Sequence, residues 1–145
     1  MSKDLDIETL LKALDNEDNA NLIQLNYAQI AADKNTILQQ LHLPKETLKT
    51  LHKQLKAYRH VDNLDAIRYG SYLRWLPLSK QTPETVKLTN GGILCHLKQV
   101  DDAIHVVCKN RFGKLFQLNM AENIIFQKLN TQEQVILSAL KHLEG

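Results

Sequence analysis

The hydrophobic positions of this chain change their spacing about halfway along it. Up to about residue 58 the apolar residues recur every three or four positions, and from Tyr69 onward they alternate with polar residues. The first spacing is typical of amphipathic helices and the second of half-buried strands. The pattern therefore predicts an α+β fold. N-terminal helices precede an antiparallel β-meander of five or six strands, forming a small barrel or a curled sheet, and a C-terminal helix follows.

Three helices are expected before the sheet. The first covers residues 4–14, and the second carries a heptad-like apolar stripe that ends at Leu43, because a residue before proline avoids the helical region. Pro44 suits the first turn of a third helix, which the apolar pattern extends to Tyr58. A narrow apolar stripe on a helix must pack against another surface, which belongs either to the rest of the chain or to a second copy of it. Self-association is the hypothesis for Ile23, Tyr27, Ile30, Ile37 and Leu41.

Turn residues predict the register of the sheet. Residues 89–92 hold the Asn-Gly pair of a type I′ hairpin, residues 101–102 centre a second hairpin, and residues 110–113 form a type I turn closed by a glycine bulge. Together these turns put one apolar set on a single face: Val86, Leu88, Ile93, Cys95, Leu97, Ile104, Val106, Cys108, Phe116, Leu118 and Met120.

The opposite face of the predicted sheet also has apolar residues. Leu94, Val107 and Leu115 alternate there with polar side chains, so a covering helix is expected. The last helix is a candidate for this cover. It is expected to begin at Thr131, with Gln134 three residues later in a capping-box pattern.

Composition is that of an ordinary globular protein. The 145 residues, 43% of them hydrophobic, fit one medium domain or two small ones, expected at 1–62 (helical, a possible assembly segment) and 63–145 (meander with helix). No apolar run is long enough to cross a membrane and no signal-peptide pattern opens the chain, so no membrane association is expected. Two cysteines favour a reducing compartment, cytoplasm or nucleus, or a virion.

The net charge of +2 is spread unevenly along the chain. Residues 1–34 hold three lysines against seven acidic residues, and residues 35–75 hold seven basic residues against three acidic ones. Within the basic part, cations alternate with aromatic rings, as in sites for single-stranded nucleic acid. The alternative is that the rings are core and the charges are solvated. The candidate nucleic-acid residues are Lys53, Lys56, Arg59, Arg68, Tyr69, Tyr72, Arg74 and Trp75.

Two Cys-His pairs are the only constellation that resembles a metal site. The predicted register puts Cys95 and Cys108 on the core face and His96 and His105 on the other face, so four ligands cannot converge on zinc. The sequence has no nucleophile elbow, phosphate-binding glycine loop or placed pair of carboxylates. We therefore expect no enzymatic activity, catalytic residue, metal or cofactor, and infer no small-molecule substrate.

The turn at residues 110–113 contains a further candidate. Phe112 stands in the turn beside Arg111 and Lys114, and an exposed aromatic between two cations is typical of a protein-contact hot spot. The alternative is a ring folded back over the edge of the sheet. A protein partner, or a second copy of the chain, is expected to contact these three residues.

Residues 67–140 resemble uncharacterised small proteins of large eukaryotic DNA viruses. The resemblance is carried by IRYGSYLRWLPL, KLTNGGIL, CKNRFGKLFQLNM and IIFQKLNTQEQVIL, and it does not extend to the N-terminal helices. It implies a virion or assembly component and no particular activity. The expected function is a non-enzymatic interaction or structural module. The alternative is a small β-barrel that binds nucleic acid through the basic and aromatic residues.

Overall fold

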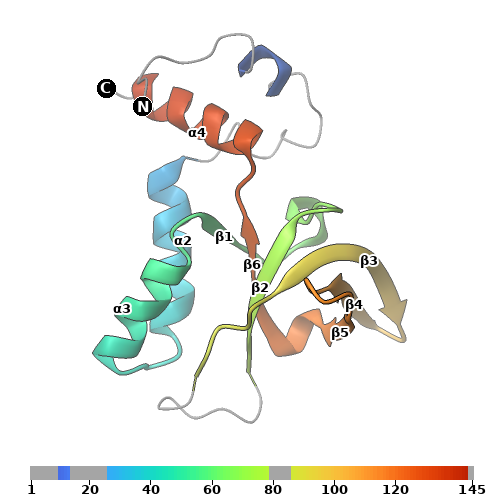
Figure 1. The fold of residues 1–145 in the computed structure, drawn as a ribbon. Helices are drawn as coiled ribbons and strands as arrows, with labels where there is room; N and C mark the ends of the chain where they lie inside the picture. Colours follow the sequence, from blue (N-terminus) through green and yellow to red (C-terminus); the bar gives the residue numbers. More distant parts are fainter. Residues whose placement is uncertain (1–9, 14–25, 79–85, 144–145) are drawn as a thin grey trace.

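The computed structural model describes residues 10–13, 26–78 and 86–143, with helices first, a sheet second and a C-terminal helix last, as predicted (Figure 1). The α+β class is confirmed, and the six antiparallel strands form a sheet that is not closed into a barrel. Residues 10–13 are helical. The other helices and strands are α2 (Tyr27–Gln39), α3 (Lys45–Gln54), β1 (Tyr58–Val61), η2 (Leu64–Ala66), β2 (Tyr72–Pro77), β3 (Gly92–Val100), β4 (Ala103–Lys109), β5 (Leu115–Asn119), η3 (Met120–Glu122), β6 (Asn123–Lys128) and α4 (Thr131–Leu143).

The ends of the first two long helices follow local rules. The Asn26 side chain accepts a hydrogen bond from the Gln29 backbone N–H and caps α2, and α3 begins directly after Pro44, as predicted. The expected continuation of α3 to Tyr58 is wrong, because α3 ends at Gln54 and Tyr58 opens β1. Tyr58 nevertheless packs in the same core as Leu51. The apolar pattern therefore continues to Tyr58, although the backbone changes from helix to strand before it.

A buried lysine interrupts the apolar stripe of α2 for a structural reason. The ammonium group of Lys34 donates a hydrogen bond of 2.8 Å to the backbone carbonyl of Leu55, just beyond the end of α3. Burial lowers the pKa of Lys34. A cation close to the carbonyl end of a helix is favourable, so this contact fastens α2 to α3.

The core lies on both sides of the central strands β2 and β6. Figure 1 shows α2 and α3 on one side of the sheet, whereas β3, β4 and β5 lie away from them. The helix-side core contains Leu38, Leu51, Leu55, Tyr58, Leu76, Ile124 and Phe126. The second core contains Val61, Ala66, Leu73, Trp75, Leu94, Val106, Cys108, Leu118 and Ile125. Residues on both sides of the expected division at position 62 share these cores.

The apolar stripe predicted for self-association packs within the chain. Ile37 and Leu41 lie against the helix-side core, and Tyr27 and Ile30 pack with Leu129 and Leu137. Ile23 lies outside the described residues. The intramolecular alternative is therefore the one that the structure favours for the described part of the stripe.

The order of strands brings distant parts of the chain together. The sheet runs β1-β6-β2-β3-β4-β5, so β2 to β5 follow as a meander while β6 returns between β1 and β2. As a result Lys128 pairs with Tyr58, and Ile125 pairs with Trp75. No turn residue in the sequence predicts that β6 lies between β1 and β2, because the pairing of β6 with these strands joins segments that are far apart along the chain.

The expected hairpin around Asn90-Gly91 is wrong. Residues 86–91 are not a strand, and β3 starts at Gly92, which pairs with Leu73 of β2. Gly91 has φ +86, and a Cβ placed there would lie 2.1 Å from the Leu73 backbone oxygen. The glycine therefore allows a close approach of two backbones, and only one of the two left-handed residues of a type I′ turn is present.

A β-bulge at Cys95 changes the predicted register of β3. Leu97 pairs with Val106 as expected, but beyond the bulge Leu94, rather than Cys95, pairs with Cys108. Leu94 is therefore buried at 2% exposure, whereas Ile93 is 48% exposed and Cys95 is exposed. A bulge adds one residue to one strand and so reverses the faces beyond it. The placement of Ile93 and Cys95 in the core was wrong for this reason.

The turn between β4 and β5 forms as predicted. The Asn110 side chain accepts hydrogen bonds from the backbone N–H groups of Phe112 and Lys114, and Gly113 has φ +82. Cys108 pairs with Phe116, which is also as expected. This part of the register was correct because residues close in sequence determine it.

The last helix differs from its prediction in its capping residue and in the surface that it covers. Asn130 rather than Thr131 caps α4, because its side chain accepts from the Glu133 N–H while the Glu133 carboxylate accepts from the Asn130 N–H. The helix does not cover the outer face of β3 to β5, where Leu115 is exposed and Val107 half-buried. It packs instead beside α2, through contacts that include Leu137 with Ile30.

Candidate binding groove

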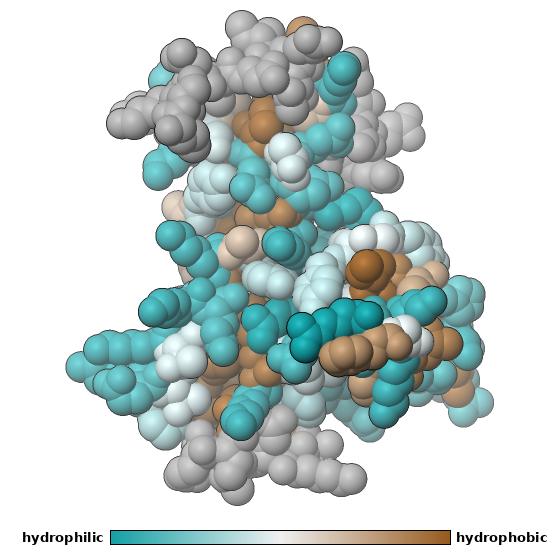
Figure 2. Space-filling view, viewed as in Figure 1, coloured by the Kyte–Doolittle hydropathy of each residue, from teal (hydrophilic) through white to brown (hydrophobic). Residues whose placement is uncertain are grey.

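A groove of about 690 Å³ lies where β2, the loop at 89–91, the turn at 110–112 and the end of β6 meet. We call it the basic-aromatic groove. It is lined by Tyr58, Tyr72, Arg74, Trp75, Thr89, Asn90, Gly91, Asn110, Arg111, Phe112, Phe116 and Lys128. The space-filling view shows hydrophobic surface mixed with strongly polar side chains on the part of the molecule formed by the strands β3 to β5 (Figure 2).

The charge of the groove has one sign. Arg74, Arg111 and Lys128 contribute three cations to the described lining, which contains no aspartate or glutamate. Lys114 stands just outside, with its ammonium nitrogen 5.1 Å from the centre of the Phe116 ring. A concave surface lined by one sign of charge concentrates ligands of the opposite sign. The groove therefore favours an anionic partner.

Aromatic rings form the rim and the wall of the groove. Phe112 is 79% exposed, and the Arg111 guanidinium carbon lies 4.7 Å from the centre of its ring. Phe116 is partly exposed and meets the buried Trp75 ring edge-on, at 6.4 Å between ring centres. The two phenylalanines offer surfaces on which a planar group can stack.

The wall at residues 89–90 is fastened to β2 by hydrogen bonds. The Arg74 Nε donates to the Thr89 carbonyl at 2.8 Å, and the Trp75 N–H donates to the Thr89 hydroxyl at 3.1 Å. The Tyr72 hydroxyl donates to the Asn90 carbonyl. Burial raises the pKa of Tyr58, and Arg74, which hydrogen-bonds this side chain, opposes that shift. These contacts hold the groove in shape without a ligand.

The structure divides the predicted nucleic-acid residues into three groups. Tyr72, Arg74 and Trp75 line the groove, as do Arg111 and Phe112 from the separate prediction of a protein contact. Arg68 and Tyr69 line a neighbouring depression, which they share with Tyr72. The remaining three residues are not part of either lining: Lys53, Lys56 and Arg59.

Several residues of the groove were missed by the sequence analysis. Lys128 is the most important, because it adds a cation from β6 that only the strand order brings beside Tyr72. Asn110 was identified as a turn residue, and Thr89 and Asn90 were assigned to a hairpin. For Lys128, the single signal in the sequence was a polar residue at the end of an apolar strand. That pattern is too common to identify a binding site.

Two of the predicted nucleic-acid residues lie near the buried carboxylate of Glu133. The Arg68 guanidinium is 2.9 Å from the carboxylate of Glu133, which is only 2% exposed. Arg59 is buried on β1, where burial lowers its pKa, Glu133 opposes the shift and Arg68 adds to it. Arg68 thus forms an ion pair with Glu133, and Glu133, Asp33 and Asp62 are all favourable charges for Arg59. Both arginines therefore have carboxylates close enough to offset their charge.

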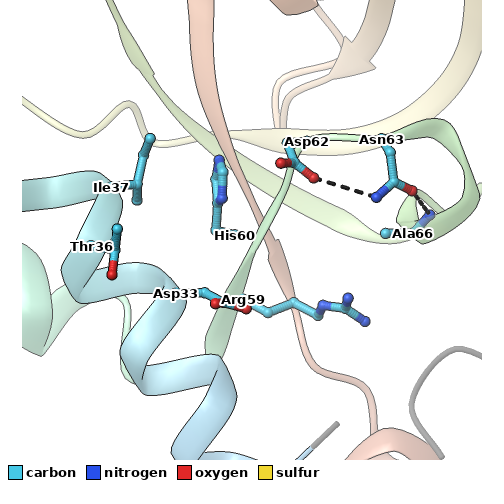
Figure 3. A pocket seen from close by; sticks show the side chains of 8 residues that line it. All are labelled: Asp33, Thr36, Ile37, Arg59, His60, Asp62, Asn63 and Ala66. Carbon is cyan, nitrogen blue, oxygen red and sulfur yellow. Dashed lines mark hydrogen bonds between the residues drawn. The ribbon is translucent and has the colours of Figure 1, made fainter. Parts of the chain in front are cut away.

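A polar pocket of about 440 Å³ lies between α2 and β1 (Figure 3). Its lining combines the carboxylates of Asp33 and Asp62 with the side chains of Arg59 and His60, so it has no single sign of charge. Asn63 braces it by donating to Asp62 and accepting from the Ala66 N–H. Burial lowers the pKa of His60, Arg59 adds to this shift, and the two aspartates oppose it. Mixed charge makes this pocket a weaker candidate for an anionic partner than the groove.

His60 is expected to make the stability of the fold sensitive to mild acid. Its pKa in the folded chain lies below the ordinary 6.5, so as the pH falls through 6.5 the unfolded chain binds a proton that the folded chain resists. Stability is therefore lost as the pH falls. His60→Gln should lose less stability between pH 7.5 and pH 5.5 than the wild type, as measured by denaturant unfolding. His142→Gln, at an exposed site on α4, is the control. If His60→Gln loses as much stability between these two pH values as the wild type does, His60 is not the source of the acid sensitivity.

The two cysteines differ in their surroundings. Cys95 is exposed on the bulge, whereas burial raises the pKa of Cys108 to about 12. In the described parts of the chain, no group of three or more histidine, cysteine, aspartate or glutamate side chains is arranged to hold a metal ion. No helix among the same residues has the length and apolar character needed to span a lipid bilayer.

Comparison with protein-family models, curated proteins and solved structures finds no match for this chain. The function is therefore inferred from the groove. Its described lining combines cations, exposed rings and side-chain amides in a shape that is already formed.

Proposed function

We propose that this chain is a non-enzymatic binding module that holds a single strand of nucleic acid in the basic-aromatic groove. The observation that carries the proposal is the convergence of Arg111 and Phe112 with Tyr72, Arg74 and Lys128 in one concave surface without a carboxylate in its described lining. Nucleic acid supplies both complementary groups, because its phosphates are anionic and its bases are planar.

A single strand fits this chemistry better than a duplex does. Bases in a duplex are stacked on their neighbours, whereas the bases of a single strand can stack on protein rings. Phe112 is the most exposed ring of the groove and projects from a turn that Asn110 stabilises. Arg111 and Lys128 line the same groove and supply cations for the phosphates of such a strand. Such stacking tolerates any base, so little sequence preference is expected.

A protein partner is the second candidate function. The same Phe112, with Arg111 and Lys114 beside it, has the character of an interface hot spot, and an acidic partner would complement its charge. A virion or assembly role stays a prediction from the sequence resemblance. The two candidate functions predict different results with a nucleic acid of arbitrary sequence. A nucleic-acid-binding module binds it, whereas a protein-binding module does not.

The proposal is tested by the fluorescence anisotropy of labelled dT10 and rU10 at two salt concentrations. Phe112→Ala is expected to weaken binding about tenfold, because stacking on one ring is worth roughly 1–3 kcal/mol per base. Lys128→Ala should weaken binding and also reduce its salt dependence, because one phosphate contact is lost. Lys56→Ala is the matched control, since Lys56 is an exposed cation outside the groove.

Two outcomes would overturn the proposal. One is that the wild type binds neither oligonucleotide at moderate salt, and in that case the protein-contact function becomes the better explanation of Phe112. The other is that Lys56→Ala weakens binding as much as Lys128→Ala does. Binding would then follow overall charge rather than the groove.

A further inference from the structure

The basic-aromatic groove continues into a second depression. This adjoining depression has a volume of about 470 Å³, and its lining includes Tyr72 and Lys128, which also line the groove. The rest of its lining comes from the turn at 68–71 and from residues around the start of α4. The two hollows therefore adjoin at the side chains of Tyr72 and Lys128.

The adjoining depression repeats the chemistry of the groove. Tyr69 is 61% exposed and supplies a ring, the exposed Lys128 supplies a cation at the junction, and no carboxylate is part of the described lining. Glu133 lies nearby but is buried, and its carboxylate is paired with the guanidinium group of Arg68. The described linings of the two hollows therefore present no carboxylate that would repel an anionic strand.

The turn that carries Tyr69 is held rigidly. The buried Gln127 side chain accepts hydrogen bonds from the Arg68 N–H and the Ser71 hydroxyl, and donates to the Ala66 carbonyl. The Gly70 N–H donates to the Leu94 carbonyl at 2.9 Å. A ring on a braced turn loses little conformational freedom on binding, which favours affinity.

We propose that one strand of nucleic acid runs from the groove across Tyr72 and Lys128 into the adjoining depression, where Tyr69 stacks a second base. This inference rests on the proposed function and extends it to the size of the site. Lys128 lies between the two stacking positions and neutralises a phosphate that links them. The full footprint is then about four to six nucleotides, within the range of single-domain modules.

The test compares Tyr69→Ala with the wild type on oligothymidines of different length. Binding of dT10 is expected to weaken about tenfold, whereas binding of dT2, which the groove alone can hold, should not change. Phe112→Ala should weaken binding of both lengths. Tyr69→Phe, which keeps the ring and loses the hydroxyl, should bind dT10 like the wild type. Thermal unfolding of each variant checks that the exposed substitutions leave the fold intact.

The outcomes separate this inference from the function on which it rests. If the wild type binds no oligothymidine of any length, the proposed function itself fails. If the wild type binds dT10 and Phe112→Ala weakens it, but Tyr69→Ala has no effect, the groove is the site and its extension is wrong. Equal weakening of dT2 and dT10 by Tyr69→Ala would also overturn the extension, because Tyr69 would then act on the groove itself.

Discussion

Glu133→Gln is expected to lower the free energy of unfolding by about 3 kcal/mol, because it removes the buried carboxylate that pairs with Arg68 and favours the charge of Arg59. Glu133 is 2% exposed and lies 2.9 Å from the guanidinium group of Arg68. It is also a favourable charge for the buried Arg59. Glutamine keeps the size of the side chain and an oxygen that accepts the Asn130 N–H, so the capping of α4 is largely preserved.

Urea unfolding followed by circular dichroism measures this effect, with Glu46→Gln as the matched control. Glu46 also lies in the first turn of a helix, but it is exposed, and the same change there should cost less than about 0.5 kcal/mol. Replacing both Arg68 and Glu133 by neutral residues should cost less than the sum of the two single changes. A loss in Glu133→Gln no larger than that in Glu46→Gln would mean that the ion pair of Glu133 with Arg68 does not fasten α4 to the sheet.

Gly91→Ala is expected to destabilise the fold by more than about 3 kcal/mol, among the largest effects of a single substitution. A Cβ at this position would lie 2.1 Å from the Leu73 backbone oxygen and 2.9 Å from a side-chain carbon of Arg74. The backbone of the central strand cannot move away, so the loop must leave its place. The hydrogen bonds of Tyr72, Arg74 and Trp75 to residues 89–90 would then be lost.

Gly70→Ala is the matched control for this change. Gly70 has φ +81, close to the φ of Gly91, but a Cβ there would have no atom within 4 Å. It should therefore cost only the strain of a left-handed alanine, about 1–2 kcal/mol. The difference between the two variants in free energy of unfolding, measured with denaturant, gives the contribution of the steric clash at Gly91 beyond that of the backbone strain. Equal losses would show that residues 89–91 adapt to a side chain, and the wall of the groove would then be less rigid than its contacts indicate.

Predictions from the sequence were most accurate where neighbouring residues decide the structure. Asn110 and Gly113 specify their turn through contacts within four residues, so the pairing of Cys108 with Phe116 was correct. Pro44 similarly marked the start of α3. The register failed at Cys95, because a bulge is favoured by the packing of Leu94 against the second core rather than by a local signal.

The candidate site was predicted only in pieces. Arg111 and Phe112 were expected to contact a protein, whereas Tyr72, Arg74 and Trp75 were expected to contact nucleic acid, in two unconnected parts of the chain. The pairing of β2 with β3, and of β3 with β4, brings the two sets together. The ion pair of Arg68 with Glu133 was not predicted, because nothing local indicates a carboxylate partner 65 positions later.

By itself, the sequence determined the class of most segments, the turn at 110–113 and the basic, aromatic character of the surface, because periodicity and turn chemistry act over a few residues. The tertiary structure alone decided that β6 lies between β1 and β2, that Tyr58 opens a strand, and that Lys128 joins the groove to the adjoining depression. These features depend on the burial of apolar side chains between segments far apart in the chain. The free energy of such burial is a property of the whole core and cannot be assigned to any one stretch of sequence.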